Sequence, residues 1–169
     1  MRTHPAQRIA VFIDVQNLYH SAKNLFKARV NFENALKYAI QDRQLVRVFA
    51  YVVKSENPEE TGEQSFFDAL EKLGIELRIK DIQVYPGGFK KADWDVGMAV
   101  DAIRLSSSVD TVVLATGDGD FIPLVEYLQA HGKLVEAMAF AKSSSGKLKE
   151  KVDLFIDLGE KPRIFLIKR

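Results

Sequence analysis

Short apolar runs typical of β-strands alternate with helical patterns along most of the chain, and this alternation restricts the fold more than any other feature. The strand-like runs cover residues 8–14, 45–53, 75–79, 111–115 and 134–138. The helical patterns cover residues 18–26, 32–40, 64–73, 94–105 and a segment that ends at 130. Strands that are apolar throughout are typical of parallel sheets buried on both faces. We therefore expect an α/β fold with a mostly parallel central sheet covered by helices on both sides.

The last part of the chain is less regular. We expect a short basic helix within 144–151, a strand or a helix end over 152–158, and a last edge strand over 163–167. Residues 82–85 are a candidate continuation of the third strand. No linker, repeat or low-complexity tract divides the 169 residues, so we expect one domain over 1–169, with a core at about 8–159 and a tail at 160–169. An edge strand in that tail could pair with a second copy in a homodimer.

Composition excludes several classes of protein. The chain has no cysteine, which removes disulfides, thiolate metal sites and cysteine nucleophiles. No apolar run approaches the roughly 18 residues of a membrane span, and the first residues lack the apolar stretch of a secretory signal, so we expect a cytoplasmic protein without a membrane partner. The net charge of +1 gives no global field, so any nucleic acid must be bound by local basic patches.

Carboxylates follow two of the predicted strands at the point where each strand ends. Asp14 ends the first strand, and Asp118 and Asp120 follow the fourth. Ligands of open α/β sheets gather beyond the carboxyl ends of the strands. If the two strands are neighbours, the three carboxylates share one crevice, and their repulsion raises their pKa values unless a cation neutralises them. Oxygen ligands alone favour Mg²⁺ or Mn²⁺.

The helix over 94–105 offers a fourth carboxylate, Asp95, with Asp93 before it and Asp101 six residues after it. Six residues correspond to about 600° of helical rotation, so Asp95 and Asp101 lie on different sides of this helix and one of them at most points into the crevice. Apolar residues lie along one side of the same helix, which we take as its packing side: Val96, Ala99, Val100 and Ile103.

Each candidate also has an ordinary structural interpretation. Asp120 precedes a proline in the first turn of the next helix and is well placed to be its N-cap, whereas Asp118 is one residue too early for that role. Asn17 could cap a helix that begins at Leu18. Asp14 is the hardest to explain structurally, because a carboxylate that ends an apolar strand has to be paired, coordinated or solvated.

Basic and hydroxyl side chains that could contact phosphates lie in two segments. They are Lys90, Lys91, Lys142, Ser143, Ser144, Ser145, Lys147, Lys149 and Lys151, of which Lys91, Ser145 and Lys147 are the preferred candidates. A solvated charged face explains the lysines equally well. Tyr85, Phe89 and Trp94 flank the first lysine pair and could stack on unpaired bases, although Trp94 could equally pack in the core.

Three motifs occur in a characteristic order: FIDVQN at 12–17, KADWDVGMAVD at 91–101 and TGDGDF at 116–121. Together they resemble the NYN domains of the PIN-like superfamily, particularly the bacterial LabA-like branch. The stretch 145–158 resembles the C-terminal segment of that branch through Leu148, Asp153, Phe155 and Leu158, so the resemblance covers about residues 8–159.

The resemblance implies a Rossmann-like three-layer α/β/α sandwich and, for active members, metal-dependent cleavage of RNA, single-stranded or structured. Four residues match the acidic metal-binding cluster of the family: Asp14, Asp95, Asp118 and Asp120. Asn17 and Thr116 match its polar supporting residues, and Asp101 matches a recurrent acid of less certain role, while Asp93 has no clear counterpart. Such a site would use Mg²⁺ or Mn²⁺ to activate water for phosphodiester hydrolysis.

Other functions fit the residues less well. A haloacid-dehalogenase-like phosphatase has a second aspartate two residues after its nucleophile, where this chain has Gln16. A dinucleotide-binding enzyme needs a glycine-rich turn after the first strand, and an EF-hand needs further spaced ligands after Asp120; neither is present. The serious alternative is a non-catalytic module of the same fold that binds RNA or a nucleotide.

Overall fold

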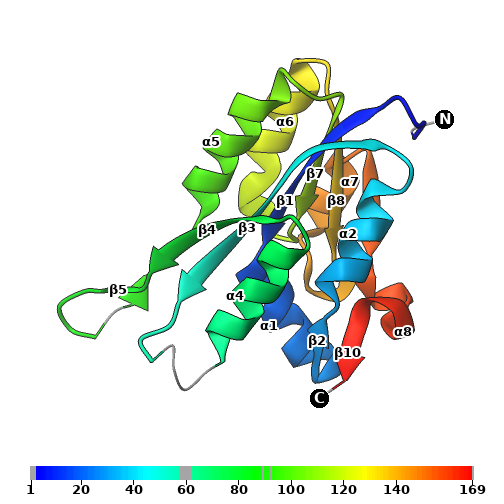
Figure 1. The fold of residues 1–169 in the computed structure, drawn as a ribbon. Helices are drawn as coiled ribbons and strands as arrows, with labels where there is room; N and C mark the ends of the chain where they lie inside the picture. Colours follow the sequence, from blue (N-terminus) through cyan, green and yellow to red (C-terminus); the bar gives the residue numbers. More distant parts are fainter. Residues whose placement is uncertain (1–2, 58–61, 89, 92, 169) are drawn as a thin grey trace.

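A six-stranded parallel sheet forms the centre of the computed structural model (Figure 1). The structure describes residues 3–57, 62–88, 90–91 and 93–168, and at 83, 84, 90 and 91 it describes the backbone alone. The strands lie in the order β4 (Glu76–Asp81), β3 (Gln44–Lys54), β1 (Arg8–Asp14), β7 (Thr111–Ala115), β8 (Leu134–Ala139) and β9 (Leu154–Asp157). The predicted α/β fold with a parallel sheet is thus confirmed, and β1 and β7 are neighbours as the carboxylate argument required.

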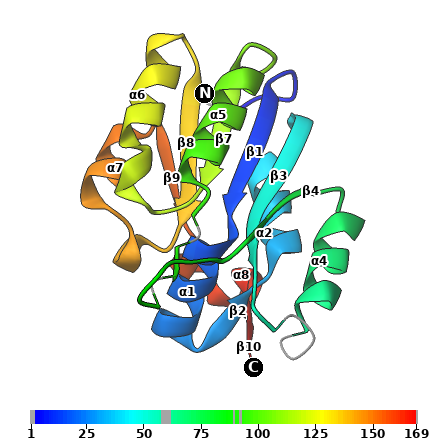
Figure 2. The same cartoon turned by 90° about the vertical axis from the view of Figure 1, so that its left-hand side faces the viewer.

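Helices cover both faces of the sheet, which gives the expected three layers (Figure 2). One face carries α1 (Val15–Phe26), α2 (Phe32–Ile40) and α4 (Glu63–Lys72). The other face carries α5 (Asp95–Ser106), α6 (Ile122–Ala130) and α7 (Gly146–Lys151). Alternate residues of each central strand point into the two resulting cores: Ile9, Val11 and Ile13 pack beneath the first group, and Ala10 and Phe12 beneath the second. No helix in the described part of the chain is long and apolar enough to cross a membrane.

The structure also contains two small antiparallel sheets that differ from the predicted strands in these segments. Residues 82–85 do not continue β4, because β5 (Gln83–Val84) forms a hairpin with β6 (Lys90–Lys91). The expected last strand over 163–167 was partly wrong: α8 (Pro162–Phe165) comes first and β10 (Leu166–Lys168) follows. A proline at the first helical position favours this start. β10 then pairs with β2 (Ala28–Val30) of the same chain, so this tail strand already has an intramolecular partner.

The packing side of α5 was predicted wrongly. Its buried residues are Met98, Asp101, Ala102 and Ser106, whereas Val96 is 77% exposed and Val100 and Ile103 are also exposed. The helix turns its small and polar side to the sheet because Asp101 has partners there, described below. Apolar periodicity therefore located the helix correctly and its buried face incorrectly.

A buried ion pair links the start of β3 to β8 across the core. Arg43 and Glu136 have side chains that are 1% and 2% exposed, and two guanidinium nitrogens donate to the two Glu136 oxygens at 2.9 and 3.0 Å. Arg43 also donates to Gln7 Oε1 and to the carbonyl oxygens of Ile40 and Ala39. The pair is fully enclosed and hydrogen-bonded, which is the condition for a buried charge to be tolerated.

Candidate metal centre

Asp14 sits where β1 passes directly into α1, and both of its carboxylate oxygens are hydrogen-bonded. Oδ1 accepts the backbone N–H of Asn17 at 3.3 Å, which makes Asp14 the N-cap of α1. Oδ2 accepts the hydroxyl of Thr116 at 2.9 Å, across from β7. The predicted cap at Asn17 is therefore wrong, because α1 begins three residues earlier than the apolar pattern indicated. Burial raises the pKa of Asp14 most, the two hydrogen bonds lower it, and Asp118 and Asp93 raise it again.

The segment after β7 is folded by its own polar side chains. The Thr116 hydroxyl oxygen accepts the N–H of Asp118 at 3.2 Å, and Asn17 Oδ1 accepts the N–H of Gly117 at 2.9 Å. Asp118 Oδ1 accepts the N–H of Asp120 at 2.9 Å and caps the 3-10 turn η1 (Gly119–Phe121). The predicted role of Asp120 as N-cap of the next helix is wrong, because the 3-10 turn delays the start of α6 to Ile122 and its N-cap is Phe121, without a side-chain cap.

Two serines after β8 press against the glycines of this segment. A Cβ atom at Gly117 would lie 2.2 Å from Ser144 Oγ and 3.0 Å from Ser144 Cα, and one at Gly119 would lie 2.9 Å from Ser145 Oγ. The N–H of Ser145 donates to the carbonyl of Gly117 at 2.9 Å. Glycine is needed at Gly117 because the backbone of Ser144 approaches closely there, whereas at Gly119 the close neighbour is the Ser145 side chain.

Three carboxylates converge at this edge of the sheet. Oxygen atoms of Asp95, Asp118 and Asp120 lie within 4.8 Å of one another. Burial and the charges of Asp118, Asp93, Asp14 and Asp120 raise the pKa of Asp95 to about 6. In the described part of the chain, no lysine or arginine forms an ion pair with these three or with Asp14. Converging carboxylates without a basic partner fit a divalent cation with oxygen ligands, and Asp14 lies beside this cluster as a fourth acid.

The N-terminus of α5 is held by Trp94, the residue before Asp95. Trp94 Nε1 donates to the carbonyl of Val52 at 2.9 Å, and its ring packs on Tyr51 with centroids 5.5 Å apart. A Cβ atom at Gly97 would lie 2.6 Å from the Trp94 ring. Trp94 therefore packs against the core, which is one of the two roles considered for it from the sequence. This packing fixes the position of Asp95 in the cluster. A glycine three residues after an aromatic residue on one helix was the signal in the sequence for this contact.

Asp101 does not join the cluster. Its carboxylate is buried on the side of α5 that faces β3, where it accepts the hydroxyl of Tyr51 at 2.7 Å and contacts Arg78 and Arg104 at 3.2 and 3.4 Å. Burial and the Asp101 carboxylate raise the pKa of Tyr51, so its hydroxyl remains a donor. The rotation argument correctly separated Asp95 from Asp101. Asp93 lies just before the N-cap of α5 and accepts the N–H of Asp95, the first helical residue, at 3.2 Å.

The predicted substrate-binding residues are placed unequally. Ser145 lies against Gly119 and accepts the N–H of Leu148 at 3.2 Å as the N-cap of α7, and Lys147 is exposed on that helix. Lys91 has a described backbone in β6, but its side chain lies outside the described residues, as does Phe89 entirely. The segment 143–147 thus borders the carboxylate cluster through the close contact between serines and glycines.

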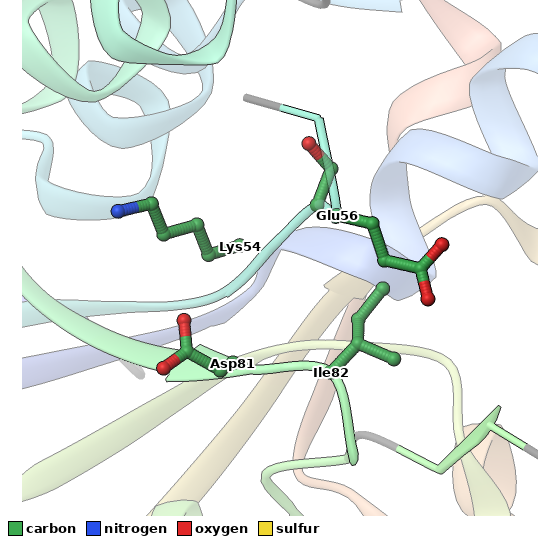
Figure 3. Close-up of a pocket in the computed structure, with 5 residues that line it drawn as sticks. Lys54, Glu56, Asp81 and Ile82 are labelled. Atoms are coloured by element: carbon green, nitrogen blue, oxygen red, sulfur yellow. The ribbon is translucent and has the colours of Figure 1, made fainter. Parts of the chain in front are cut away.

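A separate hollow lies at the same edge of the sheet (Figure 3). Its volume is about 300 Å³, and it lies where β3 and β4 end. Its lining residues are Lys54, Ser55, Glu56, Asp81 and Ile82. None of the clustered aspartates lines it, so this hollow and the carboxylate cluster are distinct features along one edge.

The comparison with family models settles what kind of protein carries this site. The model of the NYN domain matches residues 8–159. The chain belongs to the NYN domain family. The resemblance seen in the three motifs is thereby confirmed, and the match spans β1 through β9, including every aspartate of the cluster.

Two relatives of this NYN domain are similar along most of its length, and a third is similar over a shorter segment. It is 26% identical over 163 residues to the Low amplitude and bright protein LabA of Synechococcus elongatus, covering 90% of this chain and 84% of that protein. An uncharacterized protein of Methanocaldococcus jannaschii, MJ0482, is 36% identical over 70 residues, which are 40% of this chain and 29% of that one. A crystal structure of a Vibrio parahaemolyticus protein of unknown function, VPA0982, superimposes with a TM-score of 0.86 at 31% identity, covering 99% of this chain and all of that one.

Proposed function

We propose that this NYN domain is a metal-dependent endoribonuclease that hydrolyses RNA phosphodiester bonds with Mg²⁺ or Mn²⁺. The observation that carries the proposal is the convergence of Asp95, Asp118 and Asp120 within 4.8 Å. These acids come from two elements separated in sequence, and the charge between them has no basic partner among the described residues. Membership of the NYN family and the TGDGDF segment give the same site a nuclease precedent in the PIN-like superfamily.

In this proposal Asp95, Asp118 and Asp120 hold the ion. Asp14 keeps one unshared electron pair on each hydrogen-bonded oxygen and contributes a further contact, direct or through water. Such an ion polarises the phosphoryl oxygen, lowers the pKa of a bound water and stabilises the leaving oxygen. A covalent nucleophile is then unnecessary.

The remaining residues of the site orient these carboxylates. Thr116 accepts the Asp118 N–H and donates to Asp14, so one hydroxyl sets the distance between two acids. Asn17 holds the Gly117 N–H and keeps the segment against α1. Orientation of this kind, made before substrate binds, is what hydrolysis at a metal requires of the protein.

The direct test is cleavage of a fluorescently labelled, mixed-sequence single-stranded RNA in Mg²⁺, Mn²⁺ or chelator. Wild type is compared with Asp95→Asn and Asp118→Asn, and Asp42→Asn is the matched control because Asp42 is exposed and outside the cluster. We expect metal-dependent cleavage by wild type and the control and at least a 100-fold loss in both site variants, as is typical when a ligand or an acid–base group is removed.

Metal binding is measured separately by the Mn²⁺ signal in electron paramagnetic resonance. Cleavage that survives in chelator or in both variants would contradict the proposal. Binding of Mn²⁺ without cleavage of any RNA, with a DNA control, would instead favour the non-catalytic RNA- or nucleotide-binding module.

A further inference from the structure

One face of the sheet near β4 is covered by cationic side chains instead of a helix. β4 is the edge strand, and α5 packs against β1 and β7, while α4 packs against β4 from the opposite face (Figure 2). Beside α5, the uncovered part of β3 and β4 presents basic side chains from two strands and a helix: Arg47, Arg78, Lys80 and Arg104.

Three of these cations are stacked on an aromatic row that leads to the candidate metal centre. The guanidinium groups of Arg47 and Arg78 lie 4.6 and 4.8 Å from the centroid of Phe49. Phe49 contacts Tyr51, and Tyr51 contacts Trp94, the neighbour of Asp95. Lys80 Nζ lies 4.4 Å from the centroid of Trp94. Arg47 and Arg78 are held by stacking and by acids, Lys80 by stacking and by the backbone carbonyl of Asp93 at 2.8 Å, and Arg104 by Asp101. Each of these cationic groups has further N–H groups available.

The strip retains positive charge after its internal pairing. Two acids pair with three of the four cations: Glu76 with Arg47, and Asp101 with both Arg78 and Arg104. The net charge of these six side chains is therefore +2. Arg47 and Arg104 have side chains that are 43% and 69% exposed. Residues two apart on a strand, such as Arg78 and Lys80, lie about 6.6 Å apart on one face. A linear row of fixed cations at this spacing suits the regularly spaced phosphates of an extended polyanion.

We infer that this strip, formed by Arg47, Arg78, Lys80 and Arg104, binds the phosphate backbone of single-stranded RNA and leads it past Trp94 to the carboxylate cluster. The inference rests on the proposed RNA hydrolysis and adds the path of the substrate. An arginine that is bound to a carboxylate on one side can still donate to phosphate on the other. The strip also offsets the repulsion that the acidic cluster exerts on an incoming polyanion.

The test is the affinity of a short fluorescent single-stranded RNA, measured by anisotropy in chelator at several salt concentrations. The variant Arg47→Gln/Arg104→Gln removes two exposed charges and leaves Arg78 and Tyr51 on the buried Asp101. The control Lys37→Gln/Arg29→Gln removes two exposed charges from β2 and α2, which pack with α1 and α8 away from the strip. Arg47→Lys/Arg104→Lys keeps the charge.

We expect the strip variant to bind about 10-fold or more weakly, and the slope of log K against log salt to fall by about 1.4, since each phosphate contact contributes about 0.7 for single strands. The lysine variant should recover most of the slope, and the control should bind like wild type. Thermal unfolding of each variant establishes that it is folded.

The outcomes separate the inference from the proposed function. If the strip variant binds RNA as tightly as wild type, or if the control loses as much affinity, the inferred role of the strip is overturned, even if metal-dependent cleavage is observed. If RNA binding depends on the strip but no metal supports cleavage, the inferred RNA-binding role of the strip is supported and the proposed hydrolase activity is overturned. Absence of RNA binding by wild type at low salt overturns both.

Discussion

The hydroxyl of Thr116 donates to Asp14 Oδ2 at 2.9 Å and accepts the backbone N–H of Asp118 at 3.2 Å. One fully buried side chain thus joins the ends of two neighbouring strands, β1 and β7, and determines how Asp14 faces Asp118 of the cluster. Replacing the Thr116 hydroxyl by a methyl group removes both hydrogen bonds and so tests this role.

Thr116→Val should lower the free energy of unfolding by about 1–3 kcal/mol, because the Asp118 N–H and Asp14 each lose a buried partner. It should also weaken Mn²⁺ binding, because Asp14 is no longer oriented. Urea unfolding and Mn²⁺ titration measure the two effects. The matched control is Thr111→Val, since the Thr111 hydroxyl is buried without a hydrogen-bond partner among the described residues. An equal loss in both variants would contradict the assigned role.

The stability of the metal-free protein should depend on pH through Asp95. Its folded-state pKa of about 6 lies above the ordinary value of 3.8, so the folded protein binds this proton more tightly than the unfolded chain does. The tighter protonation of Asp95 therefore stabilises the folded protein fully below about pH 4. This stabilisation is lost as the pH rises to about 6, and above that pH the free energy of unfolding no longer changes through Asp95. The difference in unfolding free energy between wild type and Asp95→Asn, measured in chelator across this range, isolates it. A difference independent of pH would refute the prediction.

Neutralising an acid of the cluster should stabilise the protein when no metal is present. In chelator at neutral pH, Asp95→Asn removes repulsion from Asp118, Asp93, Asp14 and Asp120, so its Tm should rise. In Mn²⁺ wild type should have the higher Tm, because it binds the ion more tightly and is stabilised more by that binding. Calorimetry with and without Mn²⁺ measures both. Asp42→Asn should show neither change, and a lower Tm of Asp95→Asn in chelator would indicate a structural role for this carboxylate.

Gly97→Ala should displace Trp94. The new Cβ would lie 2.6 Å from the indole ring, and we expect a loss of about 1–3 kcal/mol from overpacking. Trp94 is the single tryptophan of the chain, so its fluorescence reports the displacement directly. Gly146→Ala is the control, because a Cβ there meets nothing within 4 Å in α7. An unchanged emission spectrum together with unchanged stability would contradict the packing described for Trp94.

Glu136→Gln should cost about 3–5 kcal/mol, because it leaves the buried Arg43 guanidinium without its counter-charge. The exposed pair of Glu33 and Lys37 on α2 provides the comparison: Glu33→Gln should cost less than about 0.5 kcal/mol. Urea unfolding of both variants measures the contrast. Similar costs for the two would mean that the Arg43 charge is solvated in the folded protein.

Local pattern was sufficient for most strands and for the acids at their ends, although it misplaced the caps at the start of α1 and before α6. The apolar runs located all but the last of the six strands of the central sheet, and the acids at the ends of two of them identified Asp14, Asp118 and Asp120. Helical rotation separated Asp95 from Asp101 correctly. Pattern failed where the partner is distant: the polar side of α5 is buried because Tyr51 and Arg78 meet Asp101 there.

The sequence by itself determined the α/β class with a mostly parallel sheet, the alternation of strands and helices along the chain, the family and the acids that could bind a metal. Tertiary structure alone decided that β10 pairs with β2, that Arg43 meets Glu136, and that cations line an aromatic row beside α5. The reason is physical: periodicity and turn chemistry act over a few residues, whereas these contacts join segments up to about a hundred residues or more apart, and their free energy exists only after the sheet has formed.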